Sequence, residues 1–150
     1  MGTEKFKKAL SKYERVGLDT MGFIYFLEEH PRFGALSEII FERAEAKELF
    51  IISSVLVLVE VLTGYRKAED EIAENEFKQM MEDFPNVEVF DVNRHLIDQI
   101  IHFRSKYNIK TPDAIHLATA VQRGAEVFIT NDENLKRVKE IDIMCLKDYI

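Results

Sequence analysis

The sequence predicts an α/β domain built on a central parallel sheet of four or five strands flanked by helices. Short apolar runs typical of buried strands alternate with helix-length segments from Val16 to Leu146, and no internal repeat or linker interrupts them. The chain has 150 residues, the length of one ordinary domain, and its 47% of apolar residues suffice for a sizeable core. Because only 6 Gly and 3 Pro are present, low-complexity and collagen-like architectures are excluded.

An amphipathic helix is expected ahead of this alternation, because Phe6, Leu10 and Tyr13 recur at helical spacing. This segment carries its own helical pattern and precedes the first strand. We therefore divide the chain into an N-terminal amphipathic helix, residues 1–15, and a main domain, residues 16–150.

The first half of the main domain reads as strand, two helices, strand and two helices. His30-Pro31 ends the first helix, because the residue before a proline avoids the helical conformation. Ser53 or Ser54 can cap the helix after the second strand, and Gly64 is expected to close it. The expected strands are 16–19 and 49–52, and the expected helices are 21–29, 33–47, 55–63 and 66–83.

The second half continues the alternation. Pro85-Asn86 precedes an alternating run that predicts a strand. Pro112 behind a Thr111 cap is a specific helix start, and Gly124 is expected just after the end of that helix. The expected strands are 87–90, 126–129 and 141–146, and the expected helices are 94–107, 111–123 and 131–139.

Composition excludes several classes of protein. Cys145 is the only cysteine, which excludes an intrachain disulfide and a cysteine-based zinc cage and favours a reducing, cytoplasmic compartment. The longest apolar tract, residues 50–62, is too short to span a membrane. The 20 basic and 27 acidic residues give a net charge of −7. Any nucleic acid must therefore be bound by a local group of residues or through metal ions, and not by the overall charge of the protein.

Four acidic residues lie where a parallel fold gathers its strand-to-helix loops, namely Asp19, Glu60, Asp113 and Asp132. Three of them have structural interpretations of their own. Asp19 can cap the helix that follows it, and Asp132 lies within a capping-box segment. Asp113 occupies a first helical turn, where the helix dipole favours a carboxylate.

Glu60 differs because its helix is apolar all round, so the carboxylate cannot turn to water without exposing valines and leucines. We expect Glu60 to be desolvated and close to like charges. The substitution Glu60→Gln should then raise the unfolding midpoint without metal. The alternative is a structural Glu that is neutral or hydrogen-bonded.

Four like charges at one rim repel one another unless hard divalent cations neutralise them. Carboxylate oxygens and water are the ligands that Mg²⁺ and Mn²⁺ prefer, so the sequence predicts a Mg²⁺ or Mn²⁺ site. Such a site suits the hydrolysis of phosphodiester bonds with water as the nucleophile. Which carboxylate, if any, acts as general base stays open.

The segments around these acids resemble the PIN-domain ribonucleases. The matching segments are Gly17 to Thr20, Ser53 to Glu60, Pro112 to Ala120 and Phe128 to Asp132. The resemblance covers roughly residues 16–146 and implies a metal-dependent endoribonuclease acting on RNA. It implies metal ligation and catalysis by Asp19, Glu60, Asp113 and Asp132, with Thr20, Thr130 and Asn131 as supporting polar groups.

The resemblance leaves several roles open. Small members of the family are commonly VapC-type toxins, so the candidate partners are RNA, an antitoxin protein and a second copy of the chain. A housekeeping RNA-processing nuclease and a PIN-like module that binds RNA or protein without cleavage are the alternatives. Met21 departs from the family, in which many relatives carry a small polar residue, and this bears on substrate preference.

Two further signals concern the neighbourhood of the acids. His116 lies three residues after Asp113 on one helical face and can reach the site, although a packed helix residue is the favoured interpretation. Basic side chains near the rim are interpreted either as phosphate contacts or as ordinary helix surface. They are Arg66, Lys67, Lys106, Lys110, Lys136, Arg137 and Lys139.

Overall fold

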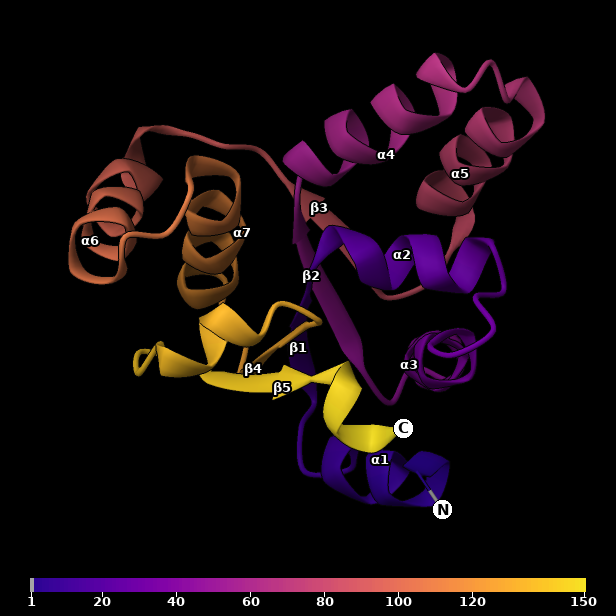
Figure 1. Ribbon diagram of the computed structural model, residues 1–150, viewed down its shortest axis with the longest axis horizontal. Coiled ribbons are helices and arrows are strands. Elements are labelled where there is room, and N and C mark those ends of the chain that lie inside the picture. Colours follow the sequence, from indigo (N-terminus) through magenta and orange to yellow (C-terminus); the bar gives the residue numbers. More distant parts are fainter. Residues whose placement is uncertain (1) are drawn as a thin grey trace.

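Five parallel strands form the sheet of the computed structural model, which describes residues 2–150 (Figure 1). The strand order is β3-β2-β1-β4-β5, so β1 lies at the centre and pairs with both β2 and β4. The α/β fold and its parallel sheet are therefore confirmed. The strands are β1 (Arg15–Leu18), β2 (Phe50–Ser54), β3 (Val87–Phe90), β4 (Val127–Thr130) and β5 (Asp142–Cys145).

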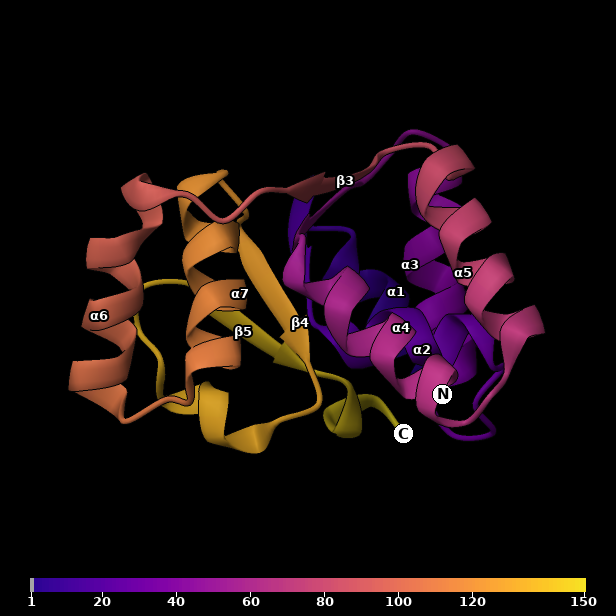
Figure 2. The same cartoon turned by 90° about the horizontal axis from the view of Figure 1, so that it is seen from above.

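Helices cover both faces of the sheet, with α6 and α7 on one side and the remaining α-helices on the other (Figure 2). The α-helices are α1 (Gly2–Leu10), α2 (Thr20–Leu27), α3 (Gly34–Glu45), α4 (Leu56–Lys67), α5 (Glu71–Asp83), α6 (Ile97–Tyr107) and α7 (Thr111–Gln122). Short 3₁₀ segments are η1 (Arg94–Leu96), η2 (Glu133–Arg137) and η3 (Leu146–Tyr149).

Each face of the sheet carries its own apolar core, because the central strands β1, β2 and β4 are largely buried. The larger core packs Leu18 of β1 with aromatic side chains such as Phe23 of α2. The smaller core lies under α6 and α7 and includes Phe103. Gly17 lets α7 approach the sheet, since a Cβ at this position would lie 2.7 Å from the Cβ of Ala120.

The N-terminal helix α1 is packed onto the main domain. Phe6 and Leu10 are fully buried, and the Phe6 ring packs edge-on against the Tyr149 ring, with the two ring centroids 5.2 Å apart. Arg43 of α3 donates a hydrogen bond to the Leu10 carbonyl. The helix ends at Leu10, earlier than the expected Arg15, yet its expected apolar face is confirmed.

The expected boundary at Gly64 is wrong. Helix α4 continues through Gly64 to Lys67, and Gly64 stands on open surface where a Cβ would meet nothing within 4 Å. The chain turns instead at Glu69, whose φ of 55° lies in the left-handed region. Asp70 then caps α5 by accepting a hydrogen bond from the backbone N of Ala73, so the helix expected over 66–83 begins only at Glu71, and Arg66 and Lys67 belong to α4.

The second half follows the expectation more closely. Gly124 has a φ of 79° just after α7, as predicted. Thr111 is the first residue of α7 and not its cap, since the N-cap is Lys110. The expected helix over 131–139 is the shorter η2, and η3 is an additional element. No helix within residues 2–150 is long and apolar enough to cross a membrane.

Candidate active site

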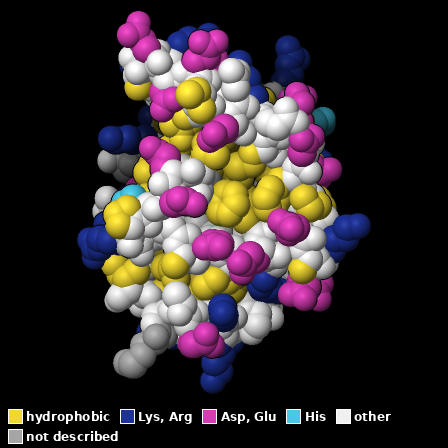
Figure 3. Space-filling model, turned by 90° about the vertical axis from the view of Figure 1, so that its right-hand side faces the viewer, with side chains coloured by type: hydrophobic (Ala, Val, Ile, Leu, Met, Phe, Trp, Pro, Cys, Tyr) yellow, Lys and Arg dark blue, Asp and Glu magenta, His cyan; other side chains and the backbone are white. Residues whose placement is uncertain are grey.

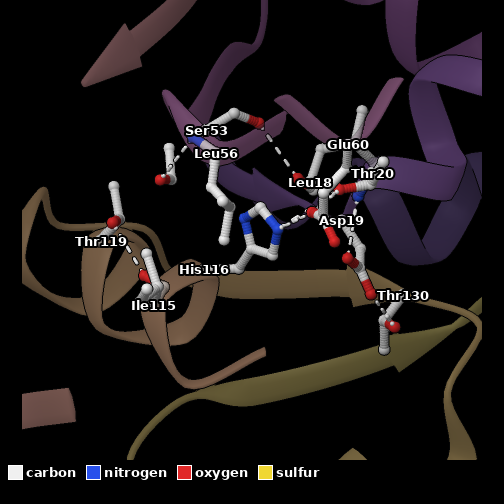
Figure 4. Close-up of polar contacts among 11 residues, drawn as sticks. Leu18, Asp19, Thr20, Ser53, Leu56, Glu60, Ile115, His116, Thr119 and Thr130 are labelled. Atoms are coloured by element: carbon white, nitrogen blue, oxygen red, sulfur yellow. Dashed lines mark hydrogen bonds and ion pairs between the residues drawn. The ribbon is translucent and has the colours of Figure 1, made fainter. Parts of the chain in front are cut away.

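The carboxyl ends of β1, β2 and β4 lie side by side and position the polar residues of the candidate site (Figure 4). Asp19 follows β1 and is the N-cap of α2, so its expected capping role is confirmed. Asp132 follows β4 and is itself the N-cap of η2, in place of the capping box that the sequence suggested for this segment. The Ser54 hydroxyl at the end of β2 accepts a hydrogen bond from the backbone N of Leu56 and starts α4. Each helix start is thereby fixed at the same edge of the sheet.

Two donors hold the Asp19 carboxylate. Its Oδ1 accepts a hydrogen bond from the backbone N of Thr20 at 2.8 Å, and its Oδ2 accepts one from the Thr130 hydroxyl at 2.7 Å. Thr130 is buried, and its Oγ1 also accepts from the backbone N of Asp132 at 3.0 Å. A single hydroxyl therefore links the acids that follow β1 and β4.

Glu60 reaches this edge from the second turn of α4. Its Oε1 accepts hydrogen bonds from the Thr20 hydroxyl at 2.7 Å and from His116 Nε2 at 2.6 Å (Figure 4). The His116 hydrogen bond, more than any other contact, lowers the pKa of Glu60, with support from Thr20, and burial only partly opposes it. The ionised form of Glu60 is thus stabilised by its neighbours.

The expectation that Glu60 is desolvated is wrong, because 36% of its side chain is exposed. Its helix reads as apolar all round but is not buried all round, and Val59 beside it is 57% exposed. The sequence pattern alone does not distinguish a buried helix from one that projects at the edge of a sheet.

Asp113 is the carboxylate on which the repulsion is concentrated. Within residues 2–150, no side chain or backbone group donates a hydrogen bond to it, unlike Asp19 and Glu60. Burial raises the pKa of Asp113, and the charges of Asp19, Asp132 and Glu60 raise it further. The four acids singled out in the sequence are therefore near enough to influence one another.

His116 is a buried helix residue, as the sequence indicated, and it is also in contact with the site. Its side chain is 2% exposed, and its Nε2 lies 2.6 Å from Glu60 Oε1 and 3.3 Å from Thr20 Oγ1. Its Nδ1 is buried without a partner among the described residues. The contact with Glu60 places a proton on Nε2, because a carboxylate oxygen can only accept.

The supporting polar residues divide into two groups. Thr20 and Thr130 donate to the carboxylates, whereas Asn131 points elsewhere. Asn131 Nδ2 donates to the Tyr25 hydroxyl at 3.2 Å, and its Oδ1 accepts from the backbone N of Lys147 at 2.9 Å. Asn131 therefore ties the end of β4 to α2 and η3, and its contacts are structural.

The donor set fits a hard divalent cation. Its oxygens come from carboxylates, and the pKa of Asp113 is raised first by burial and then by the charges of the other three acids, which a cation offsets. Within residues 2–150, no three acidic, histidine or cysteine side chains converge closely enough to enclose an ion by themselves. A cation at this edge therefore requires water or substrate oxygens among its ligands.

Solved structures match this fold over most of the chain. VapBC2 of Rickettsia felis, bound to a promoter DNA fragment, matches with a TM-score of 0.68 and 18% identity over 87% of this chain and 98% of that one. DNA-bound VapBC of Salmonella typhimurium matches with a TM-score of 0.65 and 21% identity, over 89% of this chain and 98% of that one. The Mycobacterium tuberculosis toxin VapC20, which cleaves the sarcin-ricin loop, matches with a TM-score of 0.61 and 15% identity, over 75% of this chain and 86% of that one.

Sequence comparison identifies the family. No curated protein matches the chain. The family model of the PIN domain, however, matches residues 16–141, which run from β1 to the residue before β5 and include the four acids of the candidate site. The chain belongs to the PIN-domain family.

Proposed function

We propose that this protein is a metal-dependent endoribonuclease that hydrolyses RNA phosphodiester bonds at the edge formed by Asp19, Glu60, Asp113 and Asp132. The observation that carries the proposal is the state of Asp113, whose pKa is raised by burial and then by the charges of Asp19, Asp132 and Glu60 at the same edge of the sheet. Perturbed carboxylates of this kind concentrate at functional sites. The four carboxylates are the proposed ligands of Mg²⁺ or Mn²⁺.

The neighbouring polar residues prepare the carboxylates for this role. His116 and Thr20 keep Glu60 ionised and fix its Oε1, while Thr130 fixes the Oδ2 of Asp19. These hydrogen bonds hold two of the proposed ligands in place before any substrate arrives. When bound, the metal supplies the Lewis acidity that lowers the pKa of the attacking water and offsets charge on the phosphoryl oxygens.

We further propose that the protein is the toxin of a VapBC-type pair, acting in the cytoplasm. The support is its membership in the PIN family and its likeness in fold to VapBC complexes. A surface suited to a protein partner lies between α2, α3 and α5, where apolar side chains are rimmed by acidic ones (Figure 3). We name it the acidic-rimmed groove, with Phe26, Leu27, Met80 and Phe84 at its floor and Glu29, Glu38, Glu76 and Asp83 at its rim.

The acidic-rimmed groove favours an antitoxin segment that carries apolar side chains flanked by lysines or arginines. Two adjoining cavities of about 600 and 420 Å³ make up the groove, which is large enough for several side chains. A candidate antitoxin encoded beside this chain should neutralise the wild type. It should bind the double variant Glu76→Lys, Asp83→Lys more weakly, because the rim charges are reversed.

The nuclease proposal is tested by incubating the purified protein with single-stranded RNA in Mn²⁺, in Mg²⁺ and in excess EDTA. Cleavage is expected with either metal and not with EDTA. Undiminished cleavage in EDTA contradicts the metal-dependent mechanism. Binding of RNA without cleavage under all conditions favours the alternative of a non-catalytic module, and cleavage that no antitoxin neutralises favours a housekeeping nuclease.

A further inference from the structure

The structure separates the basic residues that the sequence placed near the rim into engaged and free groups. Arg66 forms an ion pair with Glu74, and Lys106 forms one with Glu140. Lys136 is paired with Asp148 at 2.9 Å. Lysines and arginines already paired with carboxylates are poor candidates for phosphate contacts, because a phosphate would have to displace the existing partner.

Lys110 and Arg137 differ from these residues. Both line a pocket of about 180 Å³ whose wall also includes Asp113 and Asp132 of the proposed active site. Lys110 immediately precedes α7, and Arg137 ends η2, so the two cations come from separate segments of the chain. The pocket thus begins at the carboxylates and extends to two positively charged side chains.

Both cations are available to a ligand. Within residues 2–150, neither Lys110 nor Arg137 lies within 4.0 Å of a carboxylate oxygen, although two acids share the pocket with them. Arg137 uses only its Nε, which donates to the Asn134 carbonyl at 2.9 Å. This bond orients the guanidinium and leaves its terminal N–H groups free to donate.

We propose that this pocket is a subsite for a backbone phosphate of RNA next to the scissile phosphodiester. The proposal rests on the proposed nuclease function. The oriented guanidinium of Arg137 matches a phosphate in a two-pronged hydrogen bond, and Lys110 adds a point charge. In a chain with a net charge of −7, two free cations beside the acidic edge allow local contact with a polyanion that the molecule as a whole repels.

The test compares Lys110→Ala, Arg137→Ala and the double variant with Lys136→Ala. Lys136 lies one residue from Arg137, and its substitution removes the same charge, but its ammonium is paired with Asp148. Cleavage of a short single-stranded RNA is measured with Mn²⁺ over a series of salt concentrations. We expect each pocket variant to raise KM by about three- to tenfold with little change in kcat, and to reduce the salt dependence of log KM by about 0.7.

A parallel measurement separates failure of the subsite from failure of the nuclease proposal. Fluorescence anisotropy with labelled RNA is recorded in the Asp113→Asn background, which removes a proposed metal ligand and one negative charge. Weaker binding by the two pocket variants than by the Lys136→Ala control supports the subsite even if the wild type cleaves nothing. Equal behaviour of the pocket variants and the control in both assays, or no binding of RNA in any of them, overturns it.

Discussion

Glu60 and Asp113 belong to one proposed site, yet the pKa of Glu60 is lowered and that of Asp113 is raised. Glu60 is partly exposed and accepts hydrogen bonds from His116 and Thr20. Asp113 is half-buried, and no described residue donates a hydrogen bond to its carboxylate. The comparison shows that donors stabilise one carboxylate while the repulsion within the group is concentrated on the other.

The largest effect is expected from Asp113→Asn. Cleavage should fall on the order of 10³-fold or more, because a proposed metal ligand is lost. In EDTA, however, the variant should unfold at a higher temperature than the wild type, because a desolvated carboxylate among like charges becomes neutral. Cleavage rates and thermal unfolding in EDTA measure the two effects.

Asp98→Asn is the matched control for Asp113→Asn. Asp98 is also an acid in the first turn of its helix, but it is exposed and lies in α6. Its substitution removes the same charge and the same helix-dipole contact, so it should slightly lower stability and leave cleavage unchanged. If both variants unfolded alike in EDTA, the repulsion on Asp113 would not influence stability.

Glu60→Gln is expected to reduce cleavage on the order of 10²-fold, because another proposed ligand loses its charge. Its effect on stability in EDTA should be opposite to that of Asp113→Asn. The donors His116 and Thr20 favour a charged acceptor, so the neutral amide weakens two hydrogen bonds and lowers the unfolding midpoint. A higher midpoint for Glu60→Gln would restore the interpretation drawn from the sequence.

His116 allows the donor itself to be removed. His116→Leu fills the buried position with an apolar side chain but leaves Glu60 without its strongest hydrogen bond, and cleavage should fall about 10- to 100-fold. His116→Gln can place an amide N–H where Nε2 lies, so it should recover most of the lost kcat. If the two variants are equally impaired, His116 has a packing role alone.

The sequence predicted the strands and the location of the acids well, because both depend on local patterns. Short apolar runs bounded by turn residues identified β1 and β3, and each capping acid lies within two residues of the end of its strand. The prediction failed where three-dimensional exposure decides the outcome. The apolar pattern of α4 suggested burial of Glu60, but the helix lies at the edge of the fold and exposes Val59.

The specific hydrogen-bond partners in contacts between distant segments were also not predicted from the sequence. His116 and Glu60 are 56 residues apart, and only the packed fold brings the ring nitrogen to the carboxylate. Asn131 follows Thr130 directly, yet the two side chains point to different partners. Of these two adjacent residues, Thr130 therefore supports the candidate site and Asn131 supports the fold.

The smallest expected effect is a difference in how the two carboxylates respond to acid in EDTA. The ordinary pKa of Asp113 is 3.8, and the fold raises it, so the folded protein binds this proton more tightly than the unfolded chain. The destabilisation caused by charged Asp113 is fully present above the raised pKa and disappears as the pH falls to 3.8. The advantage of Asp113→Asn over the wild type should therefore shrink on acidification.

The fold shifts the pKa of Glu60 in the opposite direction. Its ordinary pKa is 4.5, and the fold lowers it, so its stabilising contribution is fully present above 4.5 and is lost as the pH falls through the lowered pKa. Unfolding midpoints of both variants and the wild type, measured in EDTA from about pH 7 to about pH 4, should show the Asp113→Asn advantage declining first. The Glu60→Gln deficit should persist until the pH is below 4.5. Parallel decline of both differences would show that the two carboxylates titrate alike and that His116 does not distinguish them.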